Sequence, residues 1–232
     1  MDAASRTAGA LAHQIANYLG TIRTTLYLLA DELGTDPEAK QDFDVVTRTV
    51  EGAAKFVEAL RAFASPQPLG QGPANLNAVL RDAEPALRTA VTPGVTLSLR
   101  LTAESLPVRG DAPRLRQLAL DLVAGASHGL GNGGRIEIET TRVPDGAPGV
   151  PSALLVVRDN GAGLEPHQAA RVFEPFVFEQ AFDAGLRLPT VYTTVVRSGG
   201  TIRAESAPGA GLAVLVTLPL DPSPARQAVP AP

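Results

Sequence analysis

The chain has 232 residues, 44% hydrophobic and 19% charged, which allows a normal hydrophobic core and disfavours global disorder. Its net charge of −4 offers no basic face for nucleic acid, and the absence of cysteine excludes disulfides, thiolate metal sites and cysteine nucleophiles. No apolar run reaches the roughly 18 residues of a spanning helix, and the N-terminus lacks a secretory signal, so we expect a cytoplasmic protein without a membrane partner.

The N-terminal part predicts two long helices joined by a short turn. No proline interrupts residues 3–33, and apolar residues recur there at alternating spacings of three and four. Asp36 and Pro37 then mark a helix start, and a second apolar seam follows. One hairpin leaves an apolar stripe half covered, so we expect two copies to form a four-helix bundle; a hairpin packed on its own C-terminal domain is the alternative. The seams are Ala12, Ile15, Leu19, Ile22, Leu26, Leu29 and Leu33, then Phe43, Val46, Val50, Ala53, Val57, Leu60 and Ala64.

His13 is the first candidate for chemistry. It lies one position off the first seam, where we expect its imidazole to be exposed on a rigid helix and open to phosphorylation. Asn17 follows one helical turn later on the same face, and its amide could hold a water or a phosphoryl oxygen. For His13 by itself, a surface histidine without a role is the alternative.

The pattern changes after the Pro/Gly-rich residues 66–73, which predict a linker between residues 1–65 and a mixed α and β domain at residues 74–220. We expect an α/β sandwich, with helices on one face of a sheet, and a disordered Pro/Ala-rich tail at residues 221–232. The expected helices are residues 76–90 and 113–127, and the expected strands are residues 95–101, 135–141, 153–158, 199–206 and 212–218.

Asp159 is the second candidate, at the end of the most apolar predicted strand. Gly161 and Gly163 follow it, so the backbone can turn closely around a ligand while the carboxylate accepts a hydrogen bond. An ordinary Asp-Asn-Gly turn is the alternative.

Four segments resemble, in family order, the motifs of sensor histidine kinases. Residues 11–19 (LAHQIANYL) resemble the H-box, and residues 157–164 (VRDNGAGL) resemble the G1 box. Residues 171–176 (RVFEPF) resemble the F-box, and residues 198–202 (SGGTI) with the segment after them resemble the closing strands. The resemblance implies a phosphoacceptor hairpin centred on His13, followed by a histidine-kinase-type ATPase domain in which Asp159 contacts the adenine amino group.

Departures from the family pattern indicate a decayed ATP site. Gln14 stands where the family has the acidic residue that acts as base, and an amide cannot accept the imidazole proton. Gly125 stands at the metal-binding asparagine and supplies no side-chain oxygen. Residues 184–190 keep one glycine of the family's phosphate-binding loop. His128 is either a residual phosphate contact or a histidine at a helix end.

We therefore expect a phosphorelay protein that passes a phosphoryl group between receiver-domain aspartates through His13, with Asn17 and Gln14 as neighbouring catalytic candidates. ATP and Mg²⁺ binding is expected to be weak or absent, and we expect no metal site. The alternatives are a sensor histidine kinase fragment that autophosphorylates His13 with ATP, and a scaffold that docks receiver domains without catalysis. The expected partners are response-regulator receiver domains and a second copy of the chain. The vestigial nucleotide site would comprise Asp159, Gly161, Gly163 and His128.

Overall fold

The computed structural model describes residues 3–30, 37–64, 68–70, 72–130, 133–146, 149–174 and 184–221. The chain divides into two compact units, residues 1–66 with 178–186 and residues 67–177 with 187–232. No helix in the described ranges combines the length and the hydropathy that crossing a membrane requires.

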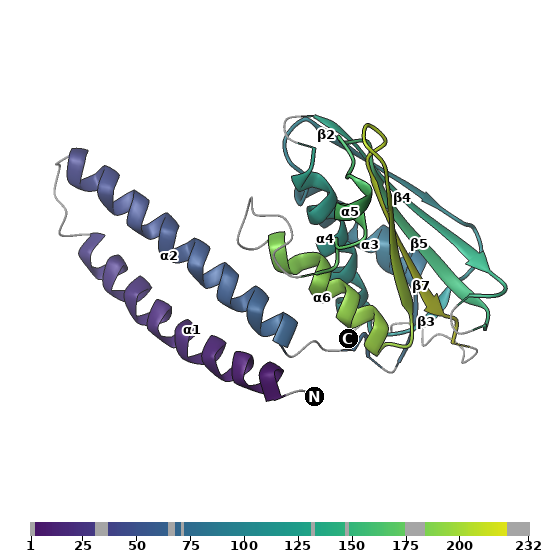
Figure 1. Cartoon of the computed structure of the whole chain (residues 1–232), viewed down its shortest axis with the longest axis horizontal. Helices are drawn as coiled ribbons and strands as arrows, with labels where there is room; N and C mark the ends of the chain where they lie inside the picture. The colour runs from purple at the N-terminus through teal and green to yellow at the C-terminus, as the bar shows by residue number, and fades with distance from the viewer. Residues whose placement is uncertain are drawn as a thin grey trace, which may run out of the picture. The chain divides into compact units, whose positions relative to one another are not determined.

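The first unit contains two long helices, α1 (Ala3–Ala30) and α2 (Pro37–Ala64), which lie side by side (Figure 1). On α2 the seam residues Val50 and Val57 are buried. On α1, Ile15, Ile22 and Leu29 keep 42%, 43% and 45% of their surface exposed. The two helices are as predicted, and a single hairpin leaves part of the seam uncovered. The turn with Asp36, the side chain of Ala12 and residue Leu33 lie outside what the structure describes.

The second unit is built on a five-stranded sheet with the order β2-β4-β5-β7-β6. β2 and β4 are parallel, and the other neighbours are antiparallel. A separate two-stranded ribbon pairs β1 with β3. The strands are β1 (Pro73–Asn75), β2 (Val95–Leu101), β3 (Pro107–Arg109), β4 (Gly134–Val143), β5 (Ser152–Asp159), β6 (Thr201–Ser206) and β7 (Leu212–Pro219).

Helices α3 (Leu76–Thr89), α4 (Ala112–His128) and α6 (Ala184–Arg197) lie on one face of this sheet, and the short α5 (Pro166–Ala169) follows β5 (Figure 1). The expected α/β sandwich with helices on one face is confirmed. Asp111 caps α4 as predicted, because its carboxylate accepts a hydrogen bond from the backbone N–H of Arg114. The apolar residues of α3 and α4 recur at helical spacing and fill the core against alternate residues of β4, β5 and β7.

Some elements differ from the sequence-based expectation. Residues 184–197 form the helix α6, where we expected only a degraded phosphate-binding loop at residues 184–190; Val191 and Val195, one turn apart, are buried in the core and hold it there. The short strands β1 and β3 were not predicted. The last strand pair begins at Thr201 instead of residue 199, because Gly199 has a φ of 76° and forms a turn.

Leu69 lies within the expected linker, and its side chain is fully buried. Its backbone N–H donates to Ser198 Oγ at 2.9 Å, and its carbonyl accepts from the N–H of Asp111 at 2.6 Å. This part of the chain is therefore packed into the second unit. Of the expected tail, only Asp221 lies within the described residues; it is buried, and its N–H donates to the carbonyl of Pro107.

Candidate functional site

Asp159 ends β5 and is only 7% exposed. One carboxylate oxygen, Oδ1, accepts hydrogen bonds from the backbone N–H groups of Gly161 at 2.8 Å and Leu212 at 3.2 Å. Burial raises the pKa of Asp159, and these two hydrogen bonds oppose the rise. The carboxylate is thus held in one orientation by the chain itself, as recognition of a ligand N–H group requires.

The glycines that follow Asp159 are required by the packing of the backbone. Gly163 has a φ of 70°, and a Cβ there would overlap the carbonyl oxygen of Ala207. Gly211, on the turn between β6 and β7, has a φ of 74°, and a Cβ there would overlap the carbonyl of Asp159. A Cβ on Gly161 would lie 3.2 Å from the carbonyl oxygen of Gly129, just past the end of α4. The expected close turn is present, and it brings the Asp159 loop against α4.

Polar groups continue along α4 away from this loop. Gln117, Asp121 and Gly125 recur every four residues and share one face of the helix. Gln117 Nε2 donates to Asp121 Oδ1 at 2.9 Å, and Arg187 Nη1 on α6 lies 3.9 Å from the same oxygen. Burial raises the pKa of Asp121, while the Gln117 hydrogen bond and the Arg187 charge oppose the rise. A Cβ on Gly125 would lie 3.8 Å from Leu188 Cδ2 and 3.9 Å from Arg187 Cδ.

His128 is exposed in the last turn of α4, beside the Asp159 loop. Ser127 before it is buried, and its hydroxyl accepts from the backbone N–H of Thr92. Both interpretations of His128, a phosphate contact and a histidine at a helix end, are compatible with this position.

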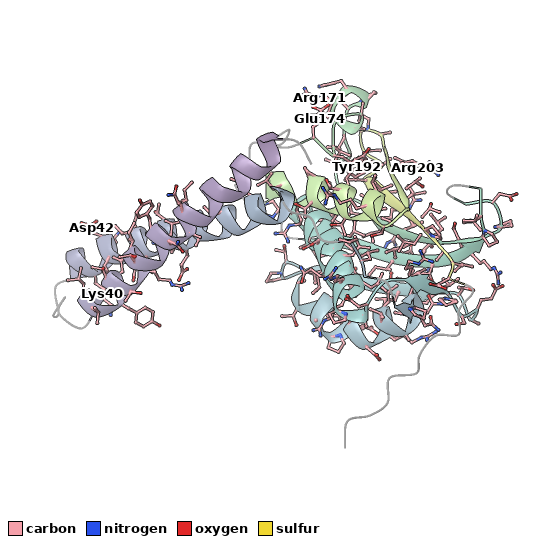
Figure 2. All side chains as sticks on the ribbon, turned by 90° about the horizontal axis from the view of Figure 1, so that it is seen from below. Lys40, Asp42, Arg171, Glu174, Tyr192 and Arg203 are labelled. Atoms are coloured by element: carbon pink, nitrogen blue, oxygen red, sulfur yellow. The ribbon has the colours of Figure 1, made fainter. Side chains whose placement is uncertain are left out.

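The segment that begins at Arg171 contacts α6 through Phe173. The Phe173 ring lies 5.5 Å from the ring of Tyr192 on α6, and Arg171 Nε lies 2.7 Å from Glu174 Oε2. Figure 2 shows Arg171 and Glu174 next to each other. The remainder of this predicted motif, residues 175–176, lies outside the described residues.

The phosphoacceptor candidates belong to the other unit. His13, Gln14 and Asn17 are all in α1, and the side chains of Gln14 and Asn17 are exposed. The predicted exposure of the His13 imidazole lies outside the described side chains. The structure therefore brings Asp159, Gly161 and Gly163 together near the end of α4, and places the candidates for phosphorylation on a separate element.

Two participants were missed from sequence. Leu212 contributes a backbone N–H, which residue type does not encode. Arg187 was not selected as a candidate, although a cation within residues 184–190, where the family has its phosphate-binding loop, is a usable signal. Within the described ranges, no three His, Asp or Glu side chains are grouped so that they could hold a metal ion.

Residues 110–222 match the family described as histidine kinase-, DNA gyrase B- and HSP90-like ATPase. The chain is 29% identical over 215 residues to the sensor histidine kinase ZraS of Klebsiella oxytoca, covering 92% of the chain and 46% of ZraS. It is 29% identical over 219 residues to the sensory histidine kinase/phosphatase NtrB of Rhodobacter capsulatus, covering 91% of the chain and 61% of NtrB. The chain thus spans less than two thirds of the length of these relatives.

Solved structures show the same fold. Full-length ShkA in complex with AMPPNP has a TM-score of 0.73 and 21% identity, covering 95% of this chain and 47% of ShkA. The catalytic domain of the histidine kinase ThkA has a TM-score of 0.53 and 22% identity, covering 64% of this chain and 94% of the domain. At these sequence identities, the structural similarity is evidence for the fold alone.

These comparisons correct one expectation. The phosphorelay protein without ATP use is wrong, because the relatives are sensor histidine kinases and the second unit matches an ATPase family. The expectation of lost ATP use rested on the residue types at single positions such as Gln14 and Gly125. The buried, backbone-held carboxylate of Asp159 does not depend on either of them.

Proposed function

We propose that this protein is a histidine kinase core that phosphorylates His13 with ATP, because residues 110–222 match a histidine kinase-like ATPase family and the chain is similar to sensor histidine kinases. The observation that carries the proposal is Asp159, whose buried carboxylate has its position fixed by two backbone N–H groups. It would accept a hydrogen bond from the amino group of adenine.

In the proposed reaction, an imidazole nitrogen of His13 attacks the γ-phosphorus of ATP. The new N–P bond forms as the bond to the β,γ-bridging oxygen breaks, and ADP leaves. Because the Gln14 amide is not a base, the imidazole proton is lost to water. The phosphoryl group would then pass to an aspartate on the receiver domain of a response regulator, as the kinase homologues suggest.

The uncovered seam of α1 supports a dimer through the hairpin. Ile15, Ile22 and Leu29 are seven residues apart and more than 40% exposed, so they form one apolar stripe along the helix. Pairing of two hairpins into a four-helix bundle would bury this stripe. Light scattering tests this: Ile22→Glu should give a monomer, while Tyr27→Glu, at a residue 80% exposed and off the stripe, should stay dimeric. A monomeric wild type would contradict the bundle.

The kinase proposal is tested with ATP radiolabelled at its γ-phosphate. The wild type should acquire acid-labile label, as a phosphoramidate does, and His13→Ala should acquire none. His167→Ala, at an exposed histidine of α5, is the matched control and should be labelled like the wild type. A wild type that stays unlabelled would contradict the proposal, and so would labelling of His13→Ala at the wild-type level.

A further inference from the structure

One face of α4 leads away from the Asp159 loop. The loop meets the chain at Gly129, and α4 rises by 1.5 Å per residue, so Gly125 lies about 6 Å and Asp121 about 12 Å further along. Asp121 and Gly125 are partly exposed on this face, and α6 runs next to it (Figure 1). A nucleotide with its base at Asp159 and its phosphates along this face would therefore reach the side chains that α6 contributes.

These side chains do not suit a divalent cation, which takes oxygen ligands. Gly125 has no side-chain oxygen. The carboxylate of Asp121 already accepts from Gln117 and is paired with Arg187. The site that the family resemblance assigns to Mg²⁺ therefore lacks its side-chain oxygen at Gly125, and the carboxylate one helical turn away is already engaged.

Arg187 lies next to this part of α4. Its Cδ would lie 3.9 Å from a Cβ added at Gly125, and its Nη1 lies 3.9 Å from Asp121 Oδ1. The Arg187–Asp121 distance of 3.9 Å exceeds the about 2.7–2.9 Å of a charge-assisted hydrogen bond. Both side chains are about a quarter exposed, 26% and 24%, so a ligand can reach them while solvent screens them little.

We propose that Arg187 binds the phosphates of the nucleotide and supplies the positive charge that a metal ion would otherwise bring. Its planar guanidinium can donate two parallel hydrogen bonds to phosphate oxygens, which a lysine cannot. Asp121 pairs with Arg187 when no nucleotide is present. This inference rests on the proposed function, because it requires that the base lies at Asp159.

Calorimetric titration with ATP, ADP and adenosine, each with Mg²⁺ and with a chelator, tests the proposal. Arg187→Gln should weaken ATP and ADP binding about tenfold or more, the loss of one charge-assisted contact, and leave adenosine binding unchanged. The ATP and ADP affinities of Arg187→Lys should lie between those of the wild type and those of Arg187→Gln. Arg197→Gln, in the last turn of the same helix, is the matched control and should bind all three like the wild type. The wild type should keep ATP affinity within about tenfold when Mg²⁺ is removed.

The outcomes separate this proposal from the kinase assignment. Wild-type ATP affinity in Arg187→Gln would overturn the role of Arg187 and leave the nucleotide site intact. Equal losses for ATP and adenosine would show that Arg187 only supports the fold. Complete loss of ATP binding in the chelator would show that a metal ion, and not Arg187, supplies the positive charge at the phosphates. A wild type that binds none of the three ligands would overturn the proposed function as well.

Discussion

Asp159 ends β5 and Asp121 lies on α4, and the chain holds these two carboxylates in different ways. Burial raises the pKa of both. Asp159 is held by backbone N–H groups, those of Gly161 and Leu212. Asp121 is held by side chains, those of Gln117 and Arg187. A backbone contact depends on the path of the chain, whereas a side-chain contact depends on single residue types. The two regions therefore respond to different kinds of substitution.

The largest effect is expected where the backbone path around Asp159 is tightest. Gly211→Ala should lower the free energy of unfolding by about 3 kcal/mol or more, since its Cβ would overlap the carbonyl of Asp159 at a φ of 74°. Gly209→Ala is the matched control: its φ is 77° and nothing lies within 4 Å, so it should cost only about 1 kcal/mol. Urea unfolding measures both, and equal costs would show that the path near Asp159 is not tightly packed.

The next effect distinguishes the Asp159 region from the Asp121 region by the ligands whose binding each one affects. Asp159→Asn replaces one hydrogen-bond acceptor by a donor where the adenine would bind. It should weaken ATP and adenosine binding equally, by about 2 kcal/mol or roughly 30-fold. Arg187→Gln, by contrast, should spare adenosine. If Asp159→Asn weakens only ATP, Asp159 acts on the phosphates and the order of the two regions along α4 is reversed.

A smaller effect should appear in the pH dependence of stability at Asp121. Its pKa in the folded protein is raised from 3.8, so the folded state binds more protons, and stability falls as pH rises through that raised pKa. Asp121→Asn removes this cost while keeping an acceptor for Gln117. Its unfolding temperature should therefore exceed that of the wild type at pH 7.

This advantage should disappear in acid, below the ordinary carboxyl pKa of 3.8. A lower unfolding temperature for Asp121→Asn at pH 7 would mean that the pair with Arg187 contributes more than burial costs.

The smallest effect is expected at His128. The residue is exposed beside the Asp159 loop, about 10 Å along α4 from Asp121, so a nucleotide whose phosphates reach Arg187 would not direct them to His128. His128→Ala should change the affinity ratio of ATP to adenosine by less than about twofold. A tenfold fall in that ratio would assign the phosphates to the end of α4 and contradict the role of Arg187.

The sequence was sufficient for most of the second unit, because its strands alternate and its helices carry apolar residues at regular spacing. The helix α6 was missed, since Gly185 and Pro189 lie in its first two turns and indicate a loop when read locally. Its burial through Val191 and Val195 is a tertiary effect that local pattern does not contain.

The residues of the candidate site were selected from the sequence, and their role stays a prediction. Asp159, Gly161 and Gly163 stood out because a carboxylate at a strand end is followed there by two glycines. The N–H of Leu212, from a strand 53 residues away, was not, because backbone donors carry no residue signature. The absence of a familiar metal ligand at Gly125 suggested lost function, since sequence alone does not show that Arg187 and Leu188 of α6 lie next to that glycine. The role of His13 and its exposure stay predictions.

The anchoring of Leu69 moves the start of the second unit towards the N-terminus of the expected linker. The side chain of this residue is fully buried, and its backbone makes two hydrogen bonds. Just before it, the carbonyl of Pro68 accepts a hydrogen bond from Arg114 Nη1 on α4. A fragment that begins at residue 74 would therefore expose an apolar hole in the core, so a stable catalytic fragment has to include residues 68–73.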